Sequence, residues 1–285
     1  MSFFENTDVR GIVSDHIDKL LNMEEEQSRE IIRIYQRIRG QLSDRLSSLP
    51  ADTFTAQRLR GVLAQVEGAI VAMTDNLTTF MLGASRQAGL LGASDLITEI
   101  DEFNEMFTGA VIPIDLDNVA VSLNANNFLV NKYEASIDAY SQGVRSTITS
   151  GLTQAAIEEI SYGETIRRVN NFLHMEEWKL HRIVRTELHT VYNVSKQIAM
   201  KDIKKQYIPD LKKTLFHPID SRTGDDSKQA KIANLIVEID KPFVYNYTRR
   251  LKDGSVVKEE RVFMTPPDRP NDRSIMVPFR EEWDQ

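Results

Sequence analysis

Three carboxylates and an imidazole lie close together in the chain, at His217, Asp220, Asp225 and Asp226. Side chains of these types bind divalent cations, so a metal-dependent enzyme that uses this cluster is one hypothesis. The spacing does not fit a calcium loop, because Arg222 and Gly224 occupy two positions at which such a loop needs oxygen ligands. We therefore favour a tight turn over residues 220–226, with no metal site and no cofactor.

Three histidines, His174, His181 and His189, are seven and eight residues apart and would share one face of a helix. Imidazoles that bind one metal ion from a helix prefer a spacing of three or four residues. A spacing of seven separates them by ~10 Å along the helix axis. The spacing therefore indicates partly buried histidines with a packing role.

The tripeptide Arg185-Thr186-Glu187 lies in the middle of a predicted helix. A catalytic carboxylate needs a partner group within hydrogen-bond reach, and the sequence identifies none for Glu187. An ion pair or a hydrogen bond between helix and sheet is the favoured interpretation.

Lysines accumulate where this helix ends and in the segment that follows: Lys196, Lys201, Lys204, Lys205, Lys212 and Lys213. Cations near the C-terminal end of a helix are favourable because of the helix dipole. The last five of these lysines could also contact phosphates, although stacking aromatic residues are not interleaved with them. A further hypothesis is therefore an ejection protein that contacts DNA or a membrane through this lysine-rich segment.

Composition excludes several classes of protein. The net charge of −7 argues against a dedicated nucleic-acid binder, and the absence of cysteine excludes disulfides and thiolate metal sites. Hydrophobic residues make up 41% of the 285 residues, which is enough for a buried core. The chain has no apolar run long enough to span a bilayer and no secretory signal pattern at its start, so we expect folding in a cytoplasm. Phosphate-binding glycine loops, Gly-x-Ser-x-Gly and His-Glu-x-x-His are absent.

Two helices are predicted before residue 81. The first covers residues 7–47 and ends before Pro50. The second carries an apolar stripe with alternating steps of four and three residues, at Leu59, Leu63, Val66, Ile70, Met73, Leu77 and Phe80. The short connection favours a long antiparallel helical hairpin at the N-terminus, and the alternative is a stripe that faces another subunit.

Further helices are predicted in the middle of the chain. Gly83, Gly89 and Gly92 interrupt the pattern before a short helix over 94–107, and residues 108–117 are expected to be extended. Helical pattern resumes over residues 124–160, a turn follows at 161–164, and Thr165 can cap the next helix. A third long helix is predicted over 175–207.

The C-terminal part changes character. Strands are predicted over 234–239, 243–251 and 255–264, and the last two are joined by the turn Lys252-Asp253-Gly254. The prolines of residues 266–285 predict irregular structure there. The fold class is therefore mainly α with a small C-terminal α+β domain, divided into regions 1–117, 118–160 and 161–285.

The order of elements in this last region resembles the phage Mu F-like head morphogenesis family, the minor capsid proteins of many tailed phages. In that family a long helix bears Arg-Thr-Glu, and a loop of the form Asp-x-Arg-Thr-Cys follows. Strands around a Pro-Phe pair come next, and the pattern ends in a Pro-x-x-His-Pro-Asn-Cys-Arg-Cys-like stretch. The matches here are Arg185-Thr186-Glu187, Asp220, Arg222, Thr223, Pro242-Phe243, Pro267, Pro270, Asn271 and Arg273.

The chain departs from the family pattern at the cysteine and histidine positions. Gly224, Asp272 and Ser274 replace the cysteines, and Ser227 and Arg269 stand near the histidine positions. A metal cluster of the Cys/His type cannot form here, so the resemblance transfers a scaffold, over less than half of the chain.

The resemblance implies a structural minor head protein and not an enzyme. Such a protein would be assembled in the host cytoplasm and located in the phage head. Its partners would be the portal protein, the major capsid protein or both, with self-association and contact with packaged double-stranded DNA as further expectations. It would act in head assembly and in DNA packaging or delivery.

Overall fold

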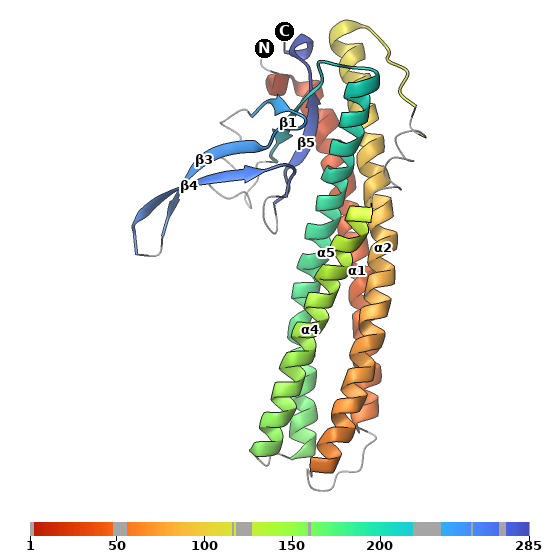
Figure 1. Ribbon diagram of the computed structural model, residues 1–285, viewed down its shortest axis with the longest axis vertical. Helices are drawn as coiled ribbons and strands as arrows, with labels where there is room; N and C mark the ends of the chain where they lie inside the picture. Colours follow the sequence, from red (N-terminus) through yellow and green to blue (C-terminus); the bar gives the residue numbers. More distant parts are fainter. Residues whose placement is uncertain are drawn as a thin grey trace. The chain divides into compact units, whose positions relative to one another are not determined.

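The computed structural model describes residues 3–47, 56–115, 117, 127–158, 161–218, 235–251, 253–267 and 272–284. Over these residues the protein is mainly α-helical with small antiparallel sheets near the C-terminus, so the predicted fold class is confirmed (Figure 1). The long helices are α1 (Thr7–Ser47), α2 (Ala56–Thr108), α4 (Asn127–Ile157) and α5 (Tyr162–Gln206). The strands are β1 (Lys212–Phe216), β2 (Val237–Glu238), β3 (Phe243–Arg250), β4 (Val256–Phe263) and β5 (Ile275–Phe279). Short 3-10 helices cover Phe3–Glu5 and Glu281–Trp283.

The chain forms two compact units. Unit 1 contains Met1–Glu24, Ser85–Asn127 and Thr186–Gln285, and unit 2 contains Glu25–Ala84 and Phe128–Arg185. The three regions expected from the sequence follow chain order, whereas α1, α2 and α5 each contribute residues to both units. None of the helices in the described ranges combines the length and the apolar character that crossing a membrane requires.

Unit 2 is a bundle of segments from α1, α2, α4 and α5. The apolar stripe of α2 is buried in it at Val66, Ile70, Met73 and Leu77. Ile70 and Met73 line the same small pocket as Tyr35 of α1 and Leu173 of α5. These stripe residues therefore pack inside the chain, as the favoured interpretation predicted.

Helices α2 and α5 are each longer than predicted. Helix α2 continues through Gly83, Gly89 and Gly92, where the sequence predicted interruptions. Glycine in a helix costs only about 1 kcal/mol relative to alanine, so tertiary packing can outweigh it. Helix α5 begins at Tyr162, inside the predicted turn, and Ser161 accepts a hydrogen bond from the Glu164 N–H at 3.3 Å.

A close approach of α2 and α5 in unit 1 explains one of the glycines. A Cβ atom on Gly92 would lie 2.4 Å from the backbone oxygen of Tyr192. Real Cβ atoms do not approach an oxygen so closely, because van der Waals repulsion rises steeply there. Glycine at position 92 therefore allows the two helices to pack at this distance.

The core of unit 1 joins these helices to the three-stranded sheet, whose strand order is β2-β1-β5. The ring of Phe3, near the N-terminus, is buried against the rings of Phe279 and Trp283, near the C-terminus. Phe103 of α2 packs on the same group of rings. Strands β1 and β5 were not predicted, and the expectation of irregular structure over 266–285 was wrong for β5. Pro278 is tolerated because, among the described strands, β5 lies at the edge of the sheet and pairs with β1 alone.

The predicted hairpin is confirmed. Strands β3 and β4 pair antiparallel from Phe243 opposite Phe263 to Arg250 opposite Val256. Gly254 adopts a φ of +85° in the turn, a conformation that glycine reaches without steric cost. The predicted strand over 234–239 is shorter than expected, since β2 covers only Val237–Glu238.

We expect Gly92→Ala to destabilise the protein by about 1–3 kcal/mol, because the added methyl group must displace the backbone of α5. The matched control is Gly83→Ala in the same helix, where a Cβ would meet nothing within 4 Å. That control should be neutral or stabilising by up to about 1 kcal/mol. Urea denaturation of both variants measures the difference, and equal stabilities would contradict the close approach.

Candidate functional site

A cluster of charged and polar side chains lies inside unit 1, in a position that normally holds apolar residues. It consists of His16 from α1, Asp95 and Glu99 from α2, and Tyr192 and Lys196 from α5. The two residues on each of α2 and α5 are four apart, so each pair lies on one helix face. All five side chains are buried, and we call them the charged core.

Lys196 and Glu99 are the centre of the charged core. The Lys196 ammonium donates to both Glu99 carboxylate oxygens at 2.6 and 2.7 Å, and neither side chain is exposed to solvent. The Nδ1 atom of His16 lies 3.0 Å from Glu99 Oε1. Both Glu99 oxygens thus accept hydrogen bonds, which offsets part of the cost of burying the carboxylate.

Asp95 completes the charged core. The Tyr192 hydroxyl donates to Asp95 Oδ2 at 2.8 Å, and His16 Nε2 lies 3.7 Å from Asp95 Oδ1. Burial raises the pKa of Asp95, although His16, Tyr192 and Lys196 oppose the shift. Burial and the carboxylates of Glu99 and Asp95 raise the pKa of Tyr192 well above its ordinary value, so its hydroxyl stays a donor.

A second polar cluster, the histidine cluster, joins α1 and α5 to β1 and β5 within unit 1. It contains Glu24, His189, His217, Asp272 and Ser274. The two ring nitrogens of His189 face two acceptors: Nδ1 lies 2.8 Å from Glu24 Oε1, and Nε2 lies 2.8 Å from the Ser274 carbonyl. Two acceptors at these positions favour the doubly protonated ring, in which both nitrogens donate. Burial alone lowers the pKa of His189. Glu24 and the Ser274 carbonyl together raise it by more, so the net shift is upward.

The Ser274 hydroxyl connects the other two members of the histidine cluster. It donates to Asp272 Oδ1 at 2.5 Å and lies 2.5 Å from His217 Nδ1. The hydroxyl has one proton, so when it donates to Asp272 the His217 Nδ1–H donates to it. A hydrolase triad needs the carboxylate on the histidine, whereas Asp272 here bonds to the serine. The geometry therefore fits a structural crosslink between β1 and β5.

Of the four residues in the cation-binding hypothesis, the structure describes His217. His217 bonds to Ser274, and Asp220, Asp225 and Asp226 lie outside the described residues. Within the described ranges, no group of three or more histidine and carboxylate side chains is arranged to hold a metal ion.

The three histidines predicted to pack all lie on α5 but differ in their exposure to solvent. His189 is buried in the histidine cluster, His181 is half-buried, and the His174 side chain is 72% exposed. The expectation of packing therefore fits His189 best, and His174 instead lies beside Arg39 and Glu177 on the surface of unit 2.

The motif residues lie in both units. Arg185 is the last residue of unit 2 in α5, whereas Thr186 and Glu187 belong to unit 1, and Glu187 is buried. Phe243 is buried and packs on Phe263, and Pro242, Pro267 and Arg273 are half-buried. Arg222, Thr223, Pro270 and Asn271 lie outside the described residues.

The five lysines proposed to contact nucleic acid differ in their exposure to solvent. Lys201 and Lys205 are exposed. Lys204 forms an ion pair with Glu238, and Lys212 forms one with Glu281. Lys213 is fully buried: its ammonium donates to the Met264 carbonyl at 2.8 Å and lies 4.7 Å from the centre of the Phe243 ring. Lys213 is therefore not placed to contact a phosphate.

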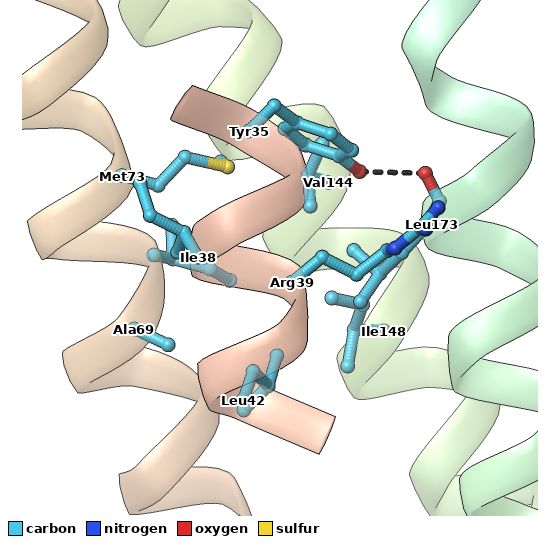
Figure 2. A pocket seen from close by; sticks show the side chains of 10 residues that line it. Tyr35, Ile38, Arg39, Leu42, Ala69, Met73, Val144, Ile148 and Leu173 are labelled. Atoms are coloured by element: carbon cyan, nitrogen blue, oxygen red, sulfur yellow. Dashed lines mark hydrogen bonds between the residues drawn. The ribbon is translucent and has the colours of Figure 1, made fainter. Parts of the chain in front are cut away.

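A pocket in unit 2 has the lining of a core defect and not of a ligand site. Its walls are formed by Tyr35, Ile38, Arg39, Leu42, Ala69, Ile70, Met73, Val144, Ile148 and Leu173 (Figure 2). The Tyr35 hydroxyl donates to the Leu173 carbonyl at 2.8 Å across one side. The space open to the centre of a water molecule is about 10 Å³, which is room for one water at most.

No protein-family model, no curated protein and no solved structure matches the chain.

The residues of the charged core do not form a recognisable motif in the sequence. His16, Asp95, Glu99 and Lys196 are scattered over the chain, and the partners Glu99 and Lys196 are 97 residues apart. The one available signal was the position of Asp95 and Glu99 on the same helix face as Leu96, Ile100 and Phe103, all of which are buried.

We expect Lys196→Met to destabilise the protein by about 3–5 kcal/mol, because it leaves the Glu99 carboxylate buried without its cation. The double variant Lys196→Met with Glu99→Met removes both charges and should lose much less than the sum of the two single variants. Urea denaturation of the four proteins gives the coupling, and additive effects would contradict the ion pair. Arg33→Met, in the exposed pair with Glu30, is the control and should cost less than about 1 kcal/mol.

A pH effect should arise from Lys213. Burial lowers its pKa from 10.5 to about 8, Lys201 adds to the shift and Asp240 opposes it. At a pH between these two pKa values, Lys213 is protonated in more of the unfolded than of the folded molecules. The free energy of unfolding therefore rises with pH in this range. Below the lower value the cost of the buried charge is fully present. We therefore expect the stability of the wild type relative to Lys213→Met to increase from about pH 8 to 10.5.

Urea denaturation across this pH range measures the effect, with Lys205→Met as the control because Lys205 is exposed. A constant difference between the wild type and Lys213→Met would show that Lys213 keeps an ordinary pKa.

Proposed function

We propose that this chain is a structural minor head protein of a tailed bacteriophage that binds the portal protein or the major capsid protein during head assembly. The observation that carries the proposal is the order of motifs from α5 to β5. Arg185-Thr186-Glu187, Pro242-Phe243, Pro267 and Arg273 follow one another as they do in the Mu F-like head morphogenesis family. In this proposal the chain is a virion protein that is assembled in the host cytoplasm.

The histidine cluster supports the proposal. Asp272 and Ser274 stand at positions where the family pattern has cysteines, and in unit 1 their side chains meet each other and His217. A scaffold built around a Cys/His site would bring these positions together. In this chain, hydrogen-bonding side chains meet at two of these positions.

The surface of α5 in unit 2 supports a role in assembly. Met175 and Trp178 are 60% and 56% exposed, and the Arg182 guanidinium lies 4.9 Å from the centre of the Trp178 ring. Methionine, tryptophan and arginine are enriched where proteins bind one another, because they contribute large contact areas. Met175 and Trp178 are three residues apart, so they lie on the same face of α5 and can contact one partner together.

Contact with packaged DNA is a smaller part of the proposal. Of the lysines expected to make it, Lys201 and Lys205 are exposed near the end of α5. Two cations supply a weak, salt-sensitive attraction, so DNA would be a neighbour in the head and not the main partner.

Mass spectrometry of purified virions from a phage that encodes the chain tests the proposal. We expect the chain in a constant ratio to the portal protein through successive purification steps. Trp178→Ala should lower the incorporated amount without changing the thermal unfolding of the purified protein. Leu90→Ala, at an exposed apolar residue of α2 in unit 1, is the control and should leave incorporation unchanged. Absence of the wild-type chain from particles would contradict the proposal.

A further inference from the structure

The hairpin of β3 and β4 presents an outer strand edge on β4. In the part of the chain that the structure describes, β4 pairs with β3 and with no further strand. At the turn, the Leu251 N–H donates to the Ser255 carbonyl at 2.8 Å. Bonded and non-bonded pairs alternate along antiparallel strands, so odd-numbered residues of β4 bond to β3. The backbone groups of Val256, Lys258, Glu260 and Val262 therefore point to the outer edge.

Side chains of these four residues all lie on one exposed face of the hairpin. Val256 and Val262 are each 57% exposed, and Val244, directly opposite Val262 on β3, is 42% exposed. Among the described strands these backbone donors and acceptors have no partner, and together with exposed β-branched side chains they form a template for another strand. A two-stranded hairpin also gains stability when further strands are added.

The sequence of β4 is complementary to itself when two copies run antiparallel. With Lys258 opposite Glu260, the four outward residues of each copy form two Lys–Glu pairs and two Val–Val pairs. Such cross-strand pairs contribute about 0.2–1 kcal/mol each. Sliding the strands by two residues in either direction places Glu260 opposite Glu260 or Lys258 opposite Lys258, which is unfavourable. Charge complementarity thus selects one register.

We propose that β4 is a self-association edge, at which a second copy of this chain pairs antiparallel to form a four-stranded sheet. Lys258 lies opposite Glu260 of the partner subunit, and Val244, Val262 and Val256 of the partner subunit form a continuous apolar row. The contact is isologous, because the same residues serve both subunits. This inference goes beyond the proposed phage function, and it is tested on the purified chain alone.

Complementary charge reversal tests the register. K258E and E260K each place like charges at two symmetric positions, so each should weaken dimerisation by roughly tenfold or more. In an equimolar mixture of the two variants, one copy presents only carboxylates at these positions and the other only ammonium groups. We therefore expect the mixture to form a heterodimer at least as tight as the wild-type dimer. Sedimentation equilibrium of the full chain over a concentration series measures all four samples.

The control pair is K205E and E102K, which makes the same changes of charge at exposed positions on α5 and α2. These variants should dimerise as the wild type does, alone or mixed. Circular dichroism melting checks that every variant is folded. A wild-type chain that stays monomeric up to about 1 mM, or a K258E and E260K mixture no tighter than either variant alone, overturns the proposal.

Glu259 gives an independent check. In the proposed register the two-fold axis passes beside Glu259, so it faces Glu259 of the partner subunit. Like charges directly opposite each other weaken a strand pair, and E259Q should therefore tighten the dimer several-fold. In the register shifted to place Glu260 opposite itself, E260Q would tighten it instead. Tightening by E260Q and not by E259Q overturns the proposed register.

Discussion

The buried ion pair between Lys196 and Glu99 is a strong constraint on the structure of unit 1. Both side chains are fully removed from solvent, and an unpaired charge in that position would cost several kcal/mol. Glu99 is on α2 and contacts two other helices: Lys196 comes from α5 and His16 comes from α1. The three helices must therefore keep one axial alignment, because a slip of one turn in any of them separates a charge from its partner. A purely apolar interface would tolerate such slips more easily.

The small residues of α2 make this alignment sterically feasible. Gly92 lets α2 approach the backbone of Tyr192, and this approach brings the Tyr192 hydroxyl to Asp95. One turn further along α5, Gly89 faces Ser195, whose Oγ would lie 3.0 Å from a Cβ at that position. Gly92, which weakens α2 as an isolated helix, is thus required for the close approach that carries these polar contacts. Local helix propensity and tertiary packing oppose each other here, and packing decides.

This opposition also separates what the sequence predicted from what it did not. The apolar spacing predicted α1 and the stripe of α2, because a helical period repeats over many residues and depends on one buried face. Gly254 and the alternating strands around it predicted the β3–β4 hairpin, since its contacts are local. The reason for glycine at position 92 was not predictable, because it lies in the close approach of Tyr192, one hundred residues away. Strand β1 was not predicted for a similar reason. Lysine is usually a surface residue, and the burial of Lys213 depends on Phe243 and the Met264 carbonyl, which are distant in the sequence.

The candidate site shows the same limit for charged residues. Lys196 and Lys213 belong to a lysine-rich stretch whose simplest explanation is a solvated helix end, yet both are buried. Lys258 and Glu260 carry the same kinds of charge on β4, and both are exposed. Charge in the core selects one arrangement of helices, since every buried carboxylate needs its own cation or donor. Charge on an exposed strand edge selects among partners and registers, since water satisfies it until another strand arrives. Residue type alone does not distinguish these roles, and the position of each charge relative to the packed faces of unit 1 does.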